Sequence, residues 1–122
     1  MSGSPQQAAP GNERLWAVIP AAGTGSRMGA SAPKQYLRIA DKTLLEYAAE
    51  AMLAVADLVG LVIALHPRDE DFASLAIARD DRVHPIEGGA ERVDSVLAGL
   101  DFLATIADDN DWILVHDAAR PC

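Results

Sequence analysis

Three short segments of this chain carry residues that could bind phosphate groups or their counter-ions: two combine glycines with charged residues, and the third carries charged residues alone. In the first, residues 20–29, Gly23 and Gly25 stand among small residues, and the cations Arg27 and Lys34 are close by. Small residues let backbone N–H groups approach a phosphate, and fixed cations offset its charge. This segment is suited to a triphosphate.

Two common phosphate-binding motifs fit the first segment less well. A P-loop requires Gly-x-x-x-x-Gly-Lys-Ser/Thr, and no lysine here follows a glycine. A dinucleotide site requires Gly-x-Gly-x-x-Gly and an acidic residue near the end of the second strand, whereas Gly29 comes one position late and that strand is expected to end at His66. On the glycines alone, a turn without a ligand stays open.

The second segment follows an expected strand at residues 83–86. Gly88 and Gly89 taken alone favour a tight turn between strand and helix. Ser95, one turn into the following helix, could hydrogen-bond a base or a ribose. Arg92 is open to two interpretations, a ligand contact or a solvated residue at the helix start.

The third segment follows an expected buried strand at residues 112–115. An unpaired carboxylate is costly there, so Asp117 needs a partner such as Arg120 or a bound cation. Mg²⁺ is commonly held by one or two carboxylates together with substrate phosphates, and Asp117 is the acidic candidate. His116 is interpreted as a packed or hydrogen-bonded residue, because no second His or Cys stands at ligand spacing.

The elements that position these segments follow from short apolar runs bounded by glycine or proline. Such runs are typical of strands covered on both faces in a parallel sheet, and helices between them imply right-handed crossovers. The sequence therefore predicts an open α/β sandwich with a mostly parallel sheet, in which ligands bind beyond the carboxyl ends of the strands. The expected strands are residues 15–19, 61–65, 83–86 and 112–115.

Three segments are expected to be helical. One begins near Thr43, which has capping-box spacing with Glu46; a short one covers residues 69–79; and a longer one follows Gly89. The first is expected to bury a face made of Leu44, Ala48, Ala51, Met52 and Val55. The last has an apolar stripe of Val93, Val96, Leu97, Leu100 and Leu103.

Composition excludes several classes of function. Half of the 122 residues are hydrophobic, enough for a core, and a net charge of −8 argues against bulk electrostatic binding to nucleic acid or anionic lipid. No apolar run reaches the roughly 20 residues of a membrane helix and no signal peptide is evident, so a cytoplasmic protein is expected. The single cysteine offers no disulfide framework, and neither His66 nor His84 is assigned a function.

The domain boundaries follow from the same patterns. Residues 1–14 are expected to be a disordered leader, because residues 2–12 are rich in Ser, Gly, Pro and Gln without periodicity. Residues 15–122 are expected to be the N-terminal part of a single domain, apparently truncated, since a core strand is expected so close to Cys122.

Four motifs together resemble the 2-C-methyl-D-erythritol 4-phosphate cytidylyltransferases of the non-mevalonate isoprenoid pathway. The resemblance covers residues 16–122, whereas other sugar-nucleotide transferases resemble only the first motif. The motifs are Pro20-Ala21-Ala22-Gly23-x-Gly25-x-Arg27-Met28, Pro33-Lys34-Gln35-Tyr36-Leu37, Gly88-Gly89-x-x-Arg92-x-x-Ser95-Val96 and Val115-His116-Asp117-Ala118-Ala119-Arg120-Pro121.

The resemblance implies a Rossmann-like α/β fold of the nucleotide-diphosphosugar transferase type, with helices on both faces of the sheet. It implies CTP and a sugar-alcohol phosphate as substrates and Mg²⁺ as cofactor. A phosphate oxygen of the acceptor, 2-C-methyl-D-erythritol 4-phosphate, attacks the α-phosphorus of CTP, and pyrophosphate leaves. The family's acceptor-binding residues and dimerisation arm belong to a second half. A homodimer is therefore expected of an intact member, and the 122-residue chain alone is expected to be inactive.

The resemblance also implies roles for individual residues. Arg27 and Lys34 would stabilise charge in the transition state, and Asp117 would meet the metal. Ala90 stands where some relatives have a longer polar residue, which removes a side-chain contact to the ribose. The nucleotide would be held by Ala21, Ala22, Gly23, Gly25, Gly89 and Ser95, with Ala118 at the ribose.

Two alternatives stay open. A ribitol- or other polyol-phosphate cytidylyltransferase is similar over the same motifs, and only acceptor assays separate it. A non-catalytic module that binds CTP without turnover is favoured by the early stop but not by the presence of both Arg27 and Lys34.

Overall fold

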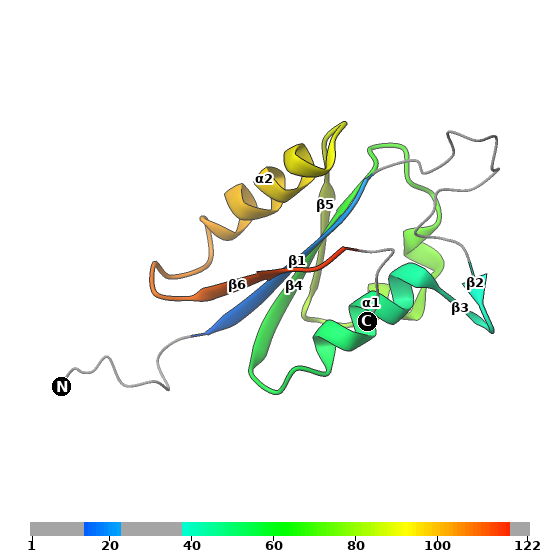
Figure 1. Ribbon diagram of the computed structural model, residues 1–122, viewed down its shortest axis with the longest axis horizontal. Coiled ribbons are helices and arrows are strands. Elements are labelled where there is room, and N and C mark those ends of the chain that lie inside the picture. Colours follow the sequence, from blue (N-terminus) through cyan, green and yellow to red (C-terminus); the bar gives the residue numbers. More distant parts are fainter. Residues whose placement is uncertain (1–13, 23–37, 118–122) are drawn as a thin grey trace.

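The computed structural model describes residues 14–22 and 38–117, which fold as a parallel sheet between two helices (Figure 1). The sheet order is β5-β4-β1-β6, and each neighbouring pair is parallel, as predicted. Neither helix is long and apolar enough to cross a membrane. The strands are β1 (Leu15–Ala21), β4 (Leu58–Leu65), β5 (Val83–Glu87) and β6 (Trp112–Val115); the helices are α1 (Leu44–Leu53) and α2 (Arg92–Leu103); β2 (Arg38–Ile39) and β3 (Lys42–Thr43) form a small antiparallel ribbon.

The two central strands supply side chains to cores on both faces of the sheet. On β1, Ala17 and Ile19 pack on the side of α1, whereas Trp16 and Val18 pack on the side of α2 together with Leu103. This alternation is the period of two that a strand imposes, and burial on both faces explains why the strands read as continuous apolar runs. The prediction of helices on both faces is confirmed (Figure 1).

Helix α1 begins at the predicted capping box. The Thr43 hydroxyl accepts from the Glu46 N–H at 3.1 Å, and the Glu46 carboxylate accepts from the Thr43 N–H at 2.9 Å. Ala51, however, is exposed, so its predicted place on the buried face is wrong. The buried face instead includes Leu45 and Ala49, which lie one helical turn apart and point at the sheet.

Helix α2 meets the sheet through a narrower face than predicted. Its buried residues are Ser95, Gly99 and Leu103, spaced four apart, while Val93 and Leu97 are 59% and 52% exposed. A Cβ on Gly99 would lie only 2.6 Å from Val18 Cγ1, so the glycine lets the helix approach β1. Two of the three residues on the face of α2 that contacts the sheet are therefore small, and Leu103 is the apolar one.

Two other predictions differ from the structure. The segment 69–79 forms two 3-10 turns, Phe72–Ser74 and Ala76–Arg79, because Leu75 between them is extended (φ −81°, ψ 148°). Phe72, Leu75 and Ile77 are all buried, although their spacing does not match one face of a single helix. The extended backbone at Leu75 breaks the helix and lets all three side chains be buried. Strand β6 is not buried: its four side chains are 37–65% exposed, and it is the edge strand of the described sheet.

The carboxylate of Asp111 fastens the start of β1 to the turn before β6. It accepts from the backbone N–H of Arg14 (3.0 Å), the indole N–H of Trp16 (2.9 Å) and the backbone N–H of Asp108 (2.9 Å). The Asp111 side chain is only 1% exposed. The Trp16 hydrogen bond, followed by the other donors, lowers the pKa of Asp111.

Candidate nucleotide-binding site

A pocket of about 480 Å³ lies at the carboxyl ends of β1, β4 and β5. This is where open α/β sheets bind ligands, and the volume lies within the range of small-molecule sites. The sheet therefore places its pocket at the edge where the sequence predicted one. The described lining residues are Ala22, His66, Pro67, Arg68, Gly88, Gly89 and Ala90.

The Gly88–Gly89 loop forms one wall of the pocket and is held from behind. Gly88 N–H donates to the Leu65 carbonyl at 2.7 Å, and Gly89 N–H donates to Ser95 Oγ at 3.1 Å. A Cβ on Gly88 would lie 2.5 Å from Ser95 Oγ and 2.6 Å from Ala22 Cβ. Glycine is therefore required where the loop after β5 packs against the end of β1.

Two predicted nucleotide contacts, Gly89 and Ser95, bind each other in this conformation. Gly89 lines the pocket, whereas Ser95 is 2% exposed and lies behind the loop. The Ser95 hydroxyl thus positions the loop, and any direct contact of Ser95 with a nucleotide stays a prediction. Ala21 and Ala22, at the end of β1, are 2% and 3% exposed, and Ala22 lies in the pocket wall.

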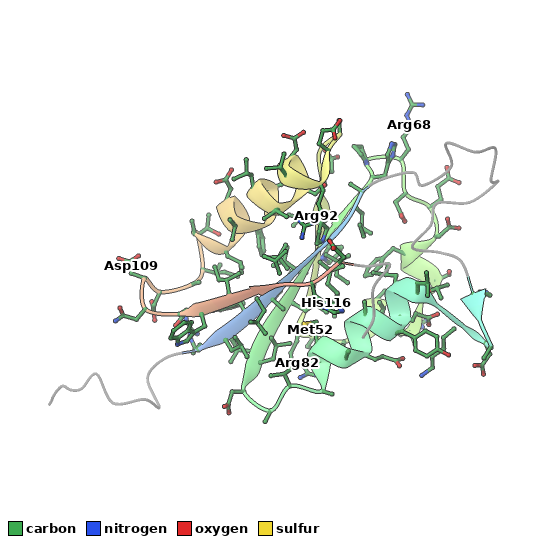
Figure 2. The ribbon with its side chains drawn as sticks, viewed as in Figure 1. Met52, Arg68, Arg82, Arg92, Asp109 and His116 are labelled. Atoms are coloured by element: carbon green, nitrogen blue, oxygen red, sulfur yellow. The ribbon has the colours of Figure 1, made fainter. Side chains whose placement is uncertain are left out.

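Asp117, the predicted metal ligand, follows β6 and binds Arg92 at the start of α2. The Arg92 Nε to Asp117 Oδ1 distance is 2.6 Å, and the side chains are 58% and 26% exposed. Figure 2 labels Arg92 where α2 passes over the sheet. Arg92 is thus an exposed residue at the helix start that pairs with Asp117, and a direct contact of Arg92 with a ligand stays a prediction. Arg120, expected to pair with Asp117, lies outside the described residues.

A metal site built by protein side chains alone is absent from the described part of the chain. No group of three or more His, Cys, Asp and Glu residues could hold an ion there. One carboxylate that follows β6, at the carboxyl edge of the sheet, fits an ion whose other ligands are nucleotide phosphates and water, which is how Mg²⁺ is usually bound. Asp117 is thus a fitting single protein ligand for such an ion.

His116 packs at the end of β6, as predicted. Its backbone N–H donates to the Val18 carbonyl at 3.0 Å, which extends the pairing of β6 with β1. Its Nε2 atom is buried without a hydrogen-bond partner among the described residues. The ring therefore serves packing here, at the cost of one unsatisfied nitrogen.

Five predicted site residues lie outside the described residues: Gly23, Gly25, Arg27, Lys34 and Ala118. Their roles stay predictions. In contrast, the structure adds two residues that the sequence did not single out, His66 and Arg68. Both residues come directly after β4, and this position at a strand end, which the three segments identified from the sequence share, could have indicated them.

A parallel sheet with a pocket at its carboxyl edge, walled by a glycine loop at a helix start, defines an α/β protein of the nucleotide-binding type. The profile of the 2-C-methyl-D-erythritol 4-phosphate cytidylyltransferases matches residues 15–122. The chain belongs to the 2-C-methyl-D-erythritol 4-phosphate cytidylyltransferase family.

Similar proteins agree with this assignment. The 2-C-methyl-D-erythritol 4-phosphate cytidylyltransferase of Photobacterium profundum is 53% identical over 110 residues, covering 90% of this chain and 46% of that protein. The enzyme of the same name from Photorhabdus laumondii is 51% identical, covering 87% and 44%. A crystal structure of a 4-diphosphocytidyl-2C-methyl-D-erythritol synthase superposes with a TM-score of 0.72 and 33% identity, covering 90% of this chain and 48% of the other.

The chain spans about half the length of the curated relatives it matches. The matched residues, 15–122, contain all four motifs quoted above and with them the pocket-lining residues Ala22, Gly88 and Gly89. The activity of a whole protein of this family is therefore a matter of proposal for this chain.

Proposed function

We propose that this chain is the CTP-binding part of an enzyme that transfers CMP from CTP to 2-C-methyl-D-erythritol 4-phosphate. A phosphate oxygen of the acceptor forms a bond to the α-phosphorus of CTP, the bond from that phosphorus to the bridging oxygen breaks, and pyrophosphate leaves. The observation that carries the proposal is the pocket of about 480 Å³ at the carboxyl edge, in a chain of this family. The reaction takes place in the cytoplasm, and the whole enzyme is a homodimer.

The residues of this chain divide the work between binding and charge stabilisation. Ala22 and the Gly88–Gly89 loop receive the nucleoside, because they form adjoining parts of the pocket wall at the ends of β1 and β5. Arg27 and Lys34 stabilise negative charge at the α-phosphate as the bonds exchange. Asp117 holds Mg²⁺, which when bound neutralises charge on the triphosphate.

A second function, CTP binding without turnover, is favoured for the 122-residue chain by itself. Its support is the length comparison: about half of each relative has no counterpart here. Positioning of the acceptor supplies much of the rate in such transfers, so a chain without the acceptor site binds CTP but releases no pyrophosphate. The names of the curated relatives favour methylerythritol phosphate over ribitol phosphate as the acceptor of the whole enzyme.

The proposal is tested by calorimetry on the purified chain with CTP or ATP in the presence of Mg²⁺. We expect CTP to bind more tightly than ATP, because the relatives that this chain matches are cytidylyltransferases. Equal affinities for CTP and ATP would overturn the assignment. Pyrophosphate release by this chain alone, dependent on methylerythritol phosphate, would show that the acceptor site lies within it.

A further inference from the structure

The described pocket has very few polar side chains to recognise a nucleotide. Of its lining residues, Ala22, Pro67, Gly88, Gly89 and Ala90 have none. The nearby Ser95 hydroxyl is already bonded to Gly89 N–H and is 2% exposed. Among the described residues, His66 and Arg68 are therefore the side chains that can donate hydrogen bonds into this pocket.

The geometry at the end of β4 determines which ring nitrogen of His66 is a donor. The backbone N–H of Arg68 donates to His66 Nδ1 at 3.0 Å. Nδ1 is thus the acceptor, so a neutral imidazole carries its proton on Nε2. The contacts of His66 within the described part of the chain leave Nε2 without a hydrogen-bond partner, while the ring is half-buried in the pocket wall.

Arg68 is less suited to contact a base than His66. Its side chain is exposed, and Figure 2 shows it pointing away from the body of the fold, beyond the loop after β4. Its backbone N–H, by contrast, fixes the His66 ring. The short segment 66–68 therefore offers one oriented donor, the Nε2–H of His66.

We propose that His66 is a specificity-determining residue of the pocket, whose Nε2–H donates a hydrogen bond to the pyrimidine base of the bound nucleotide. This inference rests on the proposed function. Cytosine has two adjacent acceptors, the ring nitrogen N3 and the carbonyl O2, whereas N3 of uracil carries a hydrogen. Because O2 is an acceptor in both bases, a donor at N3 favours cytosine over uracil and helps select CTP over UTP.

Two substitutions separate this role from a purely structural one. In His66→Gln the side-chain amide nitrogen comes close to the position of Nε2, so the donor is kept and the acceptor for Arg68 N–H is lost. In His66→Asn the amide oxygen comes close to the position of Nδ1, so the acceptor is kept and the donor is lost. A structural role predicts that Asn is the milder change, and the proposed role predicts that Gln is.

The experiment is calorimetry of the 122-residue chain and its variants with CTP and with UTP, in Mg²⁺, with thermal midpoints recorded for each variant. We expect His66→Asn to raise the Kd for CTP about tenfold, the effect of one lost hydrogen bond, and the Kd for UTP less. His66→Gln is expected to stay within about threefold of wild type.

The matched control is His84→Gln. His84 lies on β5 beside Phe102, with ring centroids 5.6 Å apart, and does not line the pocket. Its substitution is expected to leave both Kd values unchanged. The proposal is overturned if His66→Asn binds CTP like wild type, or if His66→Gln weakens CTP binding as much as His66→Asn does. A wild-type chain that binds no CTP would instead contradict the proposed function.

Discussion

Asp117 and Arg92 form an ion pair between residues 25 positions apart in the sequence, joining the residue after β6 to the start of α2. If Asp117 holds Mg²⁺ as proposed, its carboxylate is shared between the ion and a guanidinium 2.6 Å away. Arg92 then orients the carboxylate before the nucleotide arrives. Because Arg92 is 58% exposed, the pair itself adds little to folding stability.

We therefore predict that Asp117→Asn weakens the binding of Mg²⁺-CTP at least about tenfold, since loss of a partner in the second shell of a metal alone costs 10–100-fold. Binding of CTP without metal should change much less. Calorimetry with and without Mg²⁺ measures both. Asp109→Asn is the control, because Asp109 is exposed and lies at the end of the fold away from the pocket (Figure 2). Equal weakening in both conditions would exclude the metal role.

A second prediction at this scale concerns Lys34 in a chimera that joins this chain to the remaining part of the Photobacterium profundum relative. Lys34→Ala is expected to lower kcat and kcat/KM together by about 10²-fold, while the affinity for CTP changes less, the pattern of a transition-state contact. Steady-state pyrophosphate release and CTP calorimetry give the two readouts. A variant that weakens only CTP binding would make Lys34 a ground-state anchor.

Lys42→Ala is the control for the Lys34 variant. Lys42 is a surface charge just before the start of α1: its side chain is 42% exposed, and its ammonium bonds to Glu50 at 2.7 Å and lies near the ring of Tyr47. The Glu50 hydrogen bond raises the pKa of Lys42. The pair lies on β3 and α1, away from the pocket-lining residues, so turnover should be unchanged.

At the scale of elements, the contact of α2 with β1 depends on Gly99. Gly99→Ala gains helix propensity of about 1 kcal/mol but places a methyl group against Val18. We expect a net destabilisation of about 1–3 kcal/mol from overpacking, measured by urea unfolding. Asp101→Ala, on the exposed side of the same helix, should stay within about 0.5 kcal/mol. A Gly99→Ala variant as stable as wild type would mean that α2 can move away from β1 without loss.

Asp111 makes the junction of β1 and β6 sensitive to acid. Its folded-state pKa is lowered, chiefly by the Trp16 hydrogen bond, so its stabilising contribution is complete above the ordinary pKa of about 3.9 and is lost as the pH falls through the lowered value. The hydrogen bond from Arg82 likewise lowers the pKa of Asp80, so the stabilising contribution of Asp80 is also lost at acid pH. Thermal unfolding between neutral and acid pH should show a smaller decline for Asp111→Asn than for wild type. Parallel declines would contradict the assignment.

The elements could be predicted from the sequence where local pattern and packing agree. Continuous apolar runs indicate β1, β4 and β5, and the spacing of Thr43 and Glu46 indicates the start of α1. The apolar run of β6 is of the same kind, but a run of residues does not tell whether neighbouring elements cover it. The exposed edge was therefore not predictable from the run.

The sequence indicates which loops lie at the carboxyl edge of the sheet, but it does not indicate the contacts that their side chains make. The glycines after β5 and Asp117 after β6 mark strand ends, which chain order reveals. The Arg92–Asp117 pair and the Gly89–Ser95 bond depend on how α2 lies over the sheet, which spacing does not give. His66 was passed over because a lone histidine has no partner at ligand spacing in the sequence.

At the scale of the whole molecule, the structure is a sheet with a pocket at one edge and an uncovered apolar strand at its side. Trp112 is 65% exposed, and the other β6 side chains are 37–42% exposed. The chain belongs to the 2-C-methyl-D-erythritol 4-phosphate cytidylyltransferase family, has a pocket at the carboxyl edge of its sheet, and spans about half the length of the curated relatives it matches. We therefore propose that this chain binds the nucleotide and that the remaining part of the enzyme binds the acceptor.

The most direct test of this assignment is a titration of the ¹⁵N-labelled chain with Mg²⁺-CTP, followed by amide chemical shifts. We predict that the largest changes map to Ala22, Gly88, Gly89 and Asp117, at the carboxyl edge of the sheet. Amides at the opposite edge, such as those of Asp81 and Asp108, should not move. Changes gathered at that opposite edge, or none with millimolar CTP, would contradict the claim that this chain forms the CTP site.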